Sequence, residues 1–398
     1  MKKICIVCPY NYPIPAVKGG AIEQIVEDIC KVNEKERGLY ITVLVTHDEI
    51  AEKQYNDYQY TKFVPFKIHS SDKLTFFLFR VVKKLLHFYI PTSLRMLYIK
   101  RWIQQHRHDF DYFIYEDGLS YMLGYLFKGV DRNKVFNHLH WVGDPNYNSN
   151  EYFSHLLPVS QYVGNVWIQK CSTPSVSTTV LKNGIQLENF QSHMTDEQKN
   201  ILRQELGIPT GHFVVLYVGR IVQEKGVLQL LRAFDSISDK DITLLLIGAA
   251  NFAKKVQTPY EIDVMKKVQG MKHSIVQLGF IKNVELYRYQ SISDIAVIPT
   301  ICEEAASLAA VEHMAAGLPL IITDSGGLPE YADNSCAIMV SRDATMEQEL
   351  SEAIVYLKEH DEVCQTMSEN ARITSQKYSI EKTYIRLIEI ISSLGEHA

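Results

Sequence analysis

The sequence predicts an α/β protein built from two doubly wound, Rossmann-like domains. Apolar runs of strand length alternate with longer segments of helical periodicity along the chain. The runs are continuously apolar, which is typical of strands buried on both faces of a parallel sheet. The series occurs twice, and the turn dipeptide Asn183-Gly184 lies between the two halves. Each half is long enough to bury a core of its own.

The first domain is predicted to cover residues 1–183 and the second residues 184–378. Strands are expected in the first domain at KKICIVCPY, YITVLVTH, DYFIYED and KVFNHLHWV. Those of the second are expected at FVVLYVG, ITLLLIG, SIVQLGF, DIAVIPT, LPLIITD and CAIMV. A last helical segment, residues 379–398, is expected to pack back on the first domain. Two such domains create a cleft where the carboxyl ends of the strands face each other, which suits an enzyme with two substrates.

Composition argues against several classes of protein. The chain of 398 residues has a net charge of −5, which argues against general nucleic-acid binding. No stretch of about 18 uncharged apolar residues occurs, so no membrane-spanning helix is expected. The short apolar run after Lys3 predicts a strand rather than a signal peptide. Cys5 and Cys8 lie in this run, which favours free thiols of a reducing cytoplasm over a redox or metal motif.

Two cations follow the first strand of the second domain. Arg220 comes directly after that strand, and Lys225 lies five residues later on the loop into a helix. A helix N-terminus adds unpaired N–H groups and partial positive charge, so these residues fit a diphosphate site. The alternative is a solvated basic loop that also contains Glu224.

Three glutamates follow the strand DIAVIP in the second domain. Glu303 and Glu304 lie in the loop, and Glu312 lies about two turns into the helix that starts near Ser307. The loop glutamates could simply complement the helix dipole. Glu312 is harder to explain in this way, because a carboxylate in a small and apolar helix costs stability unless it is paired or binds a ligand.

These segments together resemble the retaining GT-B glycosyltransferases of family 4, and the resemblance covers nearly the whole chain. The segment from Pro299 to Pro319 resembles the family's E-x7-E signature, with Glu304 and Glu312 as its two glutamates. The remaining matching elements are Gly19-Gly20, Asn183-Gly184-Ile185, the G-R-x4-K-G element at residues 219–226 and the G-G-x-P-E element at residues 326–330.

The resemblance implies a nucleotide-sugar donor and a role for each matching residue. Arg220 and Lys225 would bind the diphosphate, Glu304 the hydroxyls of the sugar, and Glu312 those of the ribose. Other donor contacts would come from the backbone of Ser307 and Leu308, from the loop of Gly19 and Gly20 in the opposite domain, and from main chain near Phe280 and Ile281 at the base.

The chain departs from the family pattern at the start and in the middle of this helix. Ala306 and Ser307 stand where a phenylalanine and a glycine are usual, which could alter the choice of sugar. His313 replaces the usual alanine after Glu312, and nothing in the sequence explains it.

Two histidines, His138 and His140, end a strand of the first domain. The resemblance implies that His140 faces the transferred sugar, and a structural histidine is the alternative. Two histidines at this spacing could also bind a metal, but no third ligand is apparent. Asp109-Phe110-Asp111 resembles a metal-binding D-x-D but precedes its strand, at the wrong edge of the sheet. No metal or other cofactor is therefore expected.

A basic stretch runs from Lys73 to His108, with eight Lys and Arg, no acid and many aromatic residues. Such a stretch, which includes Arg80, Lys83 and Lys84, suits contact with an anionic membrane surface. The alternative is a pair of packed helices with a solvated basic face.

The function predicted from these observations is a metal-independent hexosyltransferase, cytoplasmic and peripheral on the inner face of the cell membrane. It would move a sugar, from a UDP-sugar by preference, to a lipid-linked surface-polysaccharide acceptor with retention of configuration. The alternatives are a GT-B nucleotide-sugar epimerase or hydrolase, and a silent scaffold that only binds nucleotide sugars.

Overall fold

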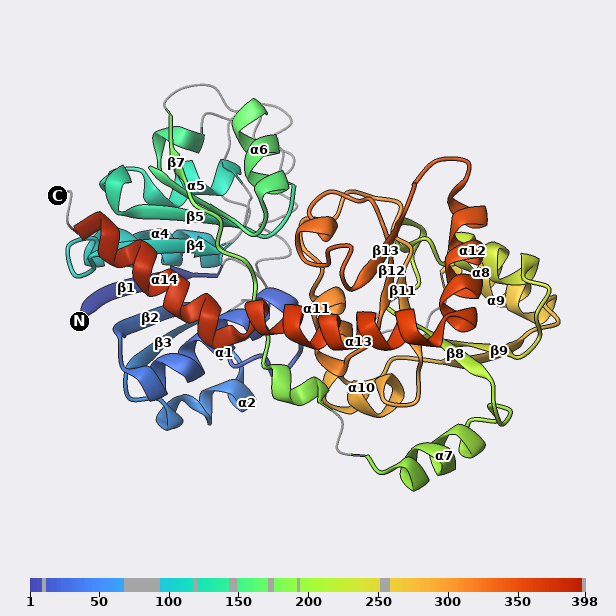
Figure 1. Ribbon diagram of the computed structural model, residues 1–398. Coiled ribbons are helices and arrows are strands. Elements are labelled where there is room, and N and C mark those ends of the chain that lie inside the picture. Colours follow the sequence, from blue (N-terminus) through green and yellow to red (C-terminus); the bar gives the residue numbers. More distant parts are fainter. Residues whose placement is uncertain are drawn as a thin grey trace. The chain divides into compact units, whose positions relative to one another are not determined.

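The computed structural model describes residues 1–8, 12–67, 94–116, 120–142, 149–170, 175–191, 194–250 and 258–395. The chain divides into two compact units, Met1–Gly184 with Ile380–Ala398, and Ile185–Ser379 (Figure 1). The prediction of two doubly wound α/β domains is confirmed, because each unit contains a parallel sheet with helices between its strands.

The first unit contains a seven-stranded sheet of order β3-β2-β1-β4-β5-β6-β7 among the described residues. Every pair of neighbouring strands is parallel. Its elements are β1 (Lys2–Val7), α1 (Ala21–Glu36), β2 (Leu39–Thr46), α2 (Glu49–Glu52), η1 (Tyr55–Asp57), β3 (Thr61–Phe66), α4 (Leu94–His106), β4 (Tyr112–Glu116), α5 (Ser120–Phe127), η2 (Arg132–Lys134), β5 (Val135–Leu139), η3 (Ser149–Glu151), β6 (His155–Pro158), α6 (Gln161–Lys170), β7 (Ser177–Thr178) and α14 (Ile380–Gly395).

The C-terminal helix α14 packs against α1 in this unit. The Tyr384 hydroxyl donates to Asn33 Oδ1 of α1 at 2.7 Å and accepts from the Gly38 N–H at 3.1 Å. The Thr383 hydroxyl donates to the Lys182 carbonyl at 3.0 Å. These contacts hold the last helix on the unit that begins the chain.

The second unit contains a six-stranded parallel sheet of order β10-β9-β8-β11-β12-β13 among the described residues. Its elements are η4 (Leu187–Phe190), α7 (Asp196–Glu205), β8 (Phe213–Val218), η5 (Gln223–Lys225), α8 (Val227–Ser236), β9 (Ile242–Ile247), α9 (Pro259–Gln269), β10 (Ser274–Leu278), α10 (Asn283–Gln290), β11 (Ile295–Ile298), α11 (Leu308–Ala316), β12 (Leu320–Thr323), η6 (Leu328–Glu330), β13 (Ala337–Val340), α12 (Met346–Glu359), α13 (Asp361–Ser375) and η7 (Gln376–Tyr378).

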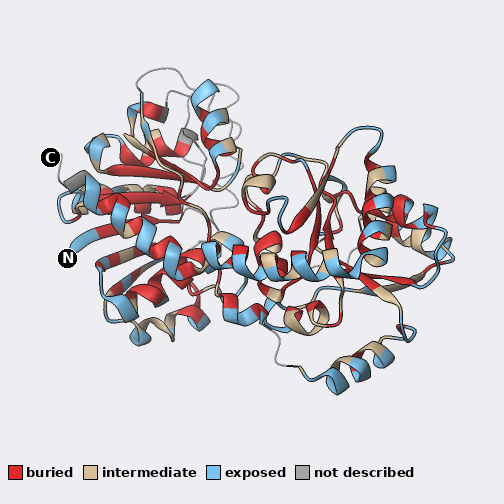
Figure 2. Cartoon of the chain, viewed as in Figure 1, coloured by how far each residue is buried: buried red, intermediate tan, exposed pale blue. Residues whose placement is uncertain are grey.

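Alternate side chains of these strands form two cores, one on each face of the second sheet. Val214 and Leu216 of β8 pack with α10 and α11, whereas Val215 and Tyr217 pack with α8 and α12. Figure 2 shows the result, with buried strands inside and the exposed sides of the helices outside. Burial on both faces explains why the strands are continuously apolar in sequence.

The order of each sheet fixes where a ligand can bind. Strand order reverses between β1 and β4 in the first unit and between β8 and β11 in the second. Loops at the carboxyl ends of such neighbours diverge to opposite faces, which leaves a crevice at the switch point. Three of these strands, β1, β8 and β11, are followed by loops that carry predicted site residues, namely Gly19 and Gly20, Arg220 and Lys225, and Glu304.

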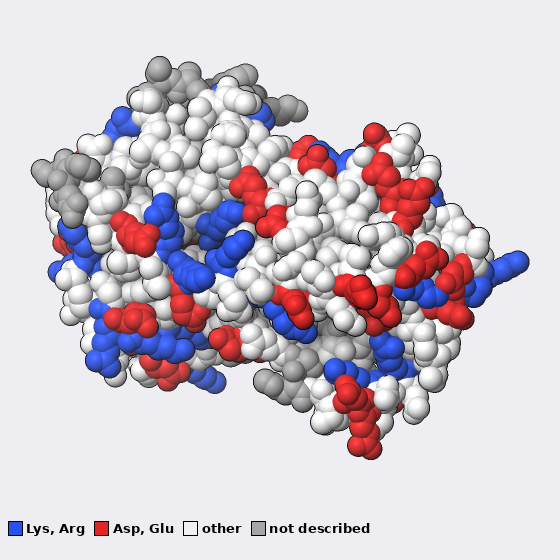
Figure 3. Space-filling view, viewed as in Figure 1, with Lys and Arg blue, Asp and Glu red and all other residues white. Residues whose placement is uncertain are grey.

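The surface drawn in Figure 3 carries positive and negative side chains interspersed on both units. None of the described helices is long and apolar enough to span a membrane. Arg80, Lys83 and Lys84, the predicted membrane contacts, lie outside the described residues.

The described end of the basic stretch is a packed helix, α4. Met96, Ile99 and Ile103 are buried. Arg95 is also buried and donates to Thr46 Oγ1 at 2.6 Å, and Lys100 Nζ lies 4.2 Å from the centre of the Tyr125 ring. This part of the stretch therefore fits the alternative of ordinary helix packing.

Candidate active site

The loops after β8 and β11 are joined at the switch point of the second unit. The Ile301 N–H and the Thr300 hydroxyl both donate to the Glu224 carbonyl at 2.9 Å. Gly226 has a φ of +67°, and a Cβ there would lie 1.8 Å from the Pro299 oxygen. Only glycine fits this close approach, which explains the glycine that follows Lys225 in the sequence.

Lys225 and Glu304 are brought together by this junction. Lys225 Nζ forms an ion pair with Glu304 Oε1, and the exposed fractions of the two side chains are 27% and 12%. The Glu304 backbone is fixed as well, because its N–H donates to Ser325 Oγ at 3.2 Å and its carbonyl accepts from the Gly327 N–H at 2.7 Å. The glycine loop after β12 thus supports the loop that carries Glu304.

Arg220, five residues before Lys225 in the sequence, is exposed. Its carbonyl accepts a hydrogen bond from the Tyr217 hydroxyl at 2.9 Å, which fixes the backbone of the turn after β8. Among the described residues its guanidinium has no ion pair, whereas Glu303 pairs with Arg342 at 2.8 Å. The Arg220 side chain is therefore available to an anionic ligand.

Helix α11 starts as the sequence predicts. Ser307 is its N-cap, and its Oγ accepts from the Ala310 N–H at 3.3 Å. Leu308 is the first residue of the helix. A helix N-terminus next to the β11 loop supplies N–H groups to oxygen atoms of a ligand.

Glu312 lies on the buried side of α11 and is 9% exposed. Its Oε1 accepts from Asn283 Nδ2 at 3.2 Å. Burial raises the pKa of Glu312 to about 7, and the hydrogen bond from Asn283 opposes that rise. The carboxyl therefore titrates near neutral pH.

His313, next to Glu312, is buried against α10. Its Nδ1 lies 3.2 Å from Gln290 Nε2, and burial lowers the pKa of His313 to about 4. The ring is therefore neutral at pH 7 and joins α11 to the end of α10. This packing role accounts for the histidine that the sequence left unexplained.

Phe280 and Ile281 follow β10, two strands from β8 in the sheet. Phe280 is 49% exposed, whereas Ile281 is half-buried and packs against the core under α11. Both residues therefore lie at the carboxyl edge of the sheet. Asn283 begins α10 just beyond this loop.

Gly19 and Gly20 lie in the loop after β1, the strand at the switch point of the first unit. Their φ angles are +78° and +110°, which L residues with a side chain rarely adopt. A Cβ on Gly20 would lie 2.2 Å from Glu23 Oε2, whereas one on Gly19 would meet nothing within 4 Å. The positive φ angles thus favour glycine at both positions, and Gly19 leaves open space beside its backbone.

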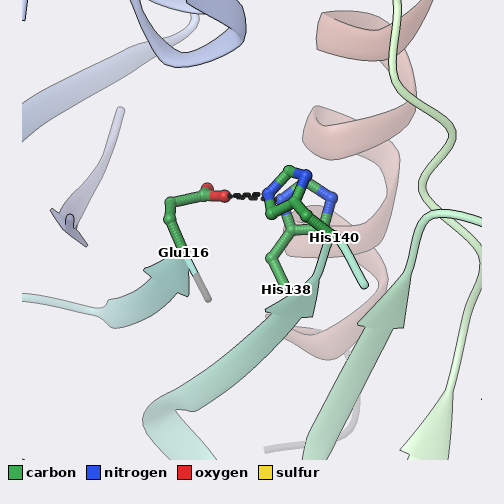
Figure 4. Close-up of side chains that lie close together, drawn as sticks. All are labelled: Glu116, His138 and His140. Carbon is green, nitrogen blue, oxygen red and sulfur yellow. Dashed lines mark hydrogen bonds and ion pairs between the residues drawn. The ribbon is translucent and has the colours of Figure 1, made fainter. Parts of the chain in front are cut away.

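A buried cluster of Glu116, His138 and His140 ends the strands β4 and β5 (Figure 4). Glu116 and His138 are register partners, and His140 lies two residues further along. His138 Nδ1 and His140 Nε2 lie 2.8 and 2.7 Å from the same carboxylate oxygen, Glu116 Oε2. The side chains of all three are at most 5% exposed.

The electrostatics of the cluster favour an ionised carboxylate and a neutral His140. Burial alone would raise the pKa of Glu116, but the contacts with the two histidines outweigh it and lower the pKa to about 2. Burial and His138 lower the pKa of His140 to about 4. His140 Nε2 therefore donates to Glu116, and its Nδ1, 3.4 Å from Asn183 Nδ2, is left as an acceptor.

The cluster corrects one expectation from the sequence, namely that no third metal ligand accompanies the two histidines. Glu116 is such a group, and the three ligand atoms lie within 4.8 Å of one another. The separations of 2.7 and 2.8 Å are those of hydrogen bonds. The ligands of a tetrahedral zinc ion would lie about 3.3 Å apart, given zinc–nitrogen bonds of about 2.0 Å. The two contacts with Glu116 Oε2 are thus those of a hydrogen-bonded cluster, in which His138 Nε2 is buried without a partner among the described residues.

Sequence reasoning missed two residues of these sites, Glu116 and Asn283. Glu116 had a signal, since it ends an apolar strand at the same edge as His138. Asn283 had none, because its contact with Glu312 spans 29 residues and depends on how α10 packs beside α11.

Comparisons with known proteins bear on the family and the fold. Residues 198–374 match the family model described as glycosyl transferases group 1. The lipopolysaccharide 1,2-N-acetylglucosaminetransferase of Salmonella typhimurium is 26% identical over 201 residues, 50% of this chain and 51% of that protein. The alpha-monoglucosyldiacylglycerol synthase of Acholeplasma laidlawii is 29% identical over 224 residues, 53% of each chain.

The chain spans about half the length of these two relatives. The crystal structure of Anabaena HepE in complex with UDP-glucose covers 99% of this chain and 100% of that one, with a TM-score of 0.73 and 19% identity. The fold is therefore that of the GT-B glycosyltransferases, as the sequence predicted. The match to the glycosyl transferases group 1 model lies within the second unit.

Proposed function

We propose that the chain is a retaining, family 4 hexosyltransferase that transfers a sugar from a nucleotide diphosphate donor. The observation that carries the proposal is the meeting of Lys225 and Glu304 at the switch point of a sheet whose neighbouring helix holds a buried Glu312. A buried carboxylate without a cationic partner, such as Glu312, costs stability, so its place beside the charged pair at the carboxyl edge of a parallel sheet supports a ligand-binding role.

Each of these residues is proposed to bind the part of the donor that suits its chemistry. Lys225 and Arg220 supply positive charge for the diphosphate, and the N-terminus of α11 adds N–H donors. Glu304 accepts from sugar hydroxyls and Glu312 from ribose hydroxyls, because carboxylate oxygens are acceptors only. The cations stabilise the leaving diphosphate in the transition state, so the reaction is proposed to need no metal.

A UDP-sugar is the favoured donor. HepE of Anabaena, which shares the fold, has been solved with UDP-glucose, with UDP and glucose, and with UDP. The names of the relatives from Salmonella and Acholeplasma refer to lipopolysaccharide and to a glucosyl diacylglycerol. We therefore extend the proposal to a lipid-linked surface glycan as acceptor and to a peripheral place at the inner face of the cell membrane.

The first test is a thermal-shift panel of UDP, GDP and ADP sugars with the purified chain, since a ligand that binds only the folded state raises the melting temperature. Release of UDP from the sugar that binds is then measured with and without glycan acceptors. Acceptor-dependent release with a glycosylated product supports a transferase. Release that ignores every acceptor indicates a hydrolase or epimerase, and binding without any turnover indicates a scaffold.

A further inference from the structure

The amide of Asn283 reaches from the start of α10 to the carboxylate of Glu312 on α11. Asn283 Nδ2 donates to Glu312 Oε1 at 3.2 Å. Asn283 is the first residue of α10 and follows the loop of Phe280 and Ile281. The contact therefore links the loop proposed for the nucleobase to the carboxylate proposed for the ribose.

The two partners differ in exposure. Glu312 is 9% exposed, whereas Asn283 is an exposed residue. Among the described residues, the bond from Asn283 is the one hydrogen bond that the Glu312 carboxyl receives. The carboxylate thus has one amide donor on Oε1, and its Oε2 remains available to another donor.

We propose that Asn283 is a positioning residue of the nucleotide site, which holds the Glu312 carboxylate in place to accept the hydroxyls of the donor's ribose. This inference rests on the proposed function. A neutral amide suits the task, because it orients the carboxylate without cancelling its charge. A lysine in its place would form an ion pair such as that of Lys225 with Glu304, which a ligand would have to separate.

The contact also bears on the protonation of Glu312. Burial raises the pKa of this group to about 7, and the Asn283 bond is the influence that lowers it. His313 beside it has a pKa of about 4 and is neutral at pH 7. Other charged groups lie on the described elements packed around α11, and none of them shifts the pKa of Glu312. They are Glu285 and Arg288 of α10, Glu188 of η4, and Arg372 of α13. Loss of the amide therefore leaves burial unopposed, and a protonated carboxyl accepts fewer hydroxyls.

The experiment is calorimetric titration of the full chain with UDP and with 2′,3′-dideoxy-UDP between pH 6 and pH 9. Asn283→Ala is expected to weaken UDP binding about 3- to 10-fold at pH 7, the scale of one net hydrogen bond. The deficit should shrink at pH 9, where Glu312 is ionised without help. Asn283→Asp cannot donate and adds a like charge, so its deficit should be larger and should persist to higher pH.

Two controls make the result specific. Val284→Ala alters the next, exposed residue of the same helix turn and should bind UDP as the wild type does. Dideoxy-UDP lacks the ribose hydroxyls, so the wild type and Asn283→Ala should bind it equally.

Three outcomes would overturn the inference. If Asn283→Ala matches the wild type at every pH while Glu312→Gln binds weakly, Glu312 does not depend on Asn283. An equal loss at every pH, for both nucleotides and with a lowered melting temperature, would mark a merely structural role. A wild type that binds none of UDP, GDP and ADP overturns the proposed function and this inference with it.

Discussion

Lys225 and Glu304 form an ion pair between the loops after β8 and β11, and each is proposed to bind a different part of the same donor. Their contact spans 79 residues of sequence. The cation for the diphosphate and the acceptor for the sugar therefore neutralise each other before a ligand arrives. A diphosphate must compete with Glu304 for Lys225, and a sugar hydroxyl must compete with Lys225 for Glu304.

Removal of either cation should slow transfer strongly. Arg220→Ala and Lys225→Ala are each expected to lower the rate of acceptor-dependent UDP release by roughly 10²- to 10³-fold. This is the scale for loss of one preorganised charge-stabilising donor. Arg232→Ala is the matched control, because Arg232 is an exposed cation of α8 that pairs with Glu347. Near-wild-type rates in both site variants would refute the diphosphate assignment.

Glu304→Gln should separate the nucleotide from the sugar. The substitution frees Lys225 from its partner, so calorimetry is expected to show unchanged or tighter binding of free UDP. Binding of the UDP-sugar should weaken relative to UDP, because an amide is a poorer acceptor of sugar hydroxyls. Weaker UDP binding with an unchanged preference for the UDP-sugar would contradict the division of roles.

Glu312→Gln should stabilise the ligand-free protein at high pH while it weakens nucleotide binding. The pKa of Glu312 is raised from 4.5 to about 7 in the folded protein, so ionisation costs stability as the pH rises from 4.5 to about 7. The full cost, up to about 3 kcal/mol at 1.36 kcal/mol per pKa unit, is present above pH 7 and absent below pH 4.5. Gln carries no such cost.

The measurement is the melting temperature of the wild type and Glu312→Gln at pH 5 and at pH 8.5. The melting temperature of the variant should exceed that of the wild type by much more at pH 8.5 than at pH 5. Glu285→Gln, at an exposed position of α10, should show no such difference between the two pH values. A gain that is equal at both pH values would rule out ionisation as its cause.

The fold could be predicted from sequence because continuous apolar strands and helical periodicity repeat along the chain, and burial on both faces of a sheet leaves few other arrangements. The placement of Arg220, Lys225 and Glu304 at the carboxyl edge of the sheet could be predicted by the same reasoning, since each residue comes shortly after a strand. Pairings could not be predicted in this way. That Glu116 lies opposite His138 depends on the register of β4 and β5, which side-chain periodicity alone does not set.

Transfer should persist in excess chelator, since Arg220 and Lys225 supply the positive charge that a metal would otherwise provide. The rate of UDP release with and without EDTA measures this directly. A loss that added Mn²⁺ or Zn²⁺ restores would contradict the metal-free proposal. The Glu116 cluster would then be the place to look, and Glu116→Gln should abolish the restoration if the ion binds there.

The last prediction concerns the basic stretch, residues 73–108. The described part of the stretch shows that some of its cations are not available to a membrane. Arg95 is buried and Lys100 packs on Tyr125, so neither is free to meet a membrane. Arg101 and Arg107 remain exposed, so the prediction rests on these two cations and on the sequence of residues 73–93, which contains Arg80, Lys83 and Lys84. Anionic lipid attracts a nearby cation by about 1 kcal/mol, so three or four together give reversible attachment.

We expect salt-sensitive binding to vesicles that contain anionic lipid and little binding to neutral vesicles. Arg80→Glu, Lys83→Glu and Lys84→Glu together should abolish it and leave UDP affinity unchanged. The charge-matched control replaces the exposed Lys53, Lys128 and Lys266 by Glu, which changes net charge equally and should leave most of the binding intact. Equal losses in the two triple variants would indicate a general effect of net charge. A wild type that ignores anionic vesicles at low salt would refute membrane contact and direct the search for an acceptor to soluble glycans.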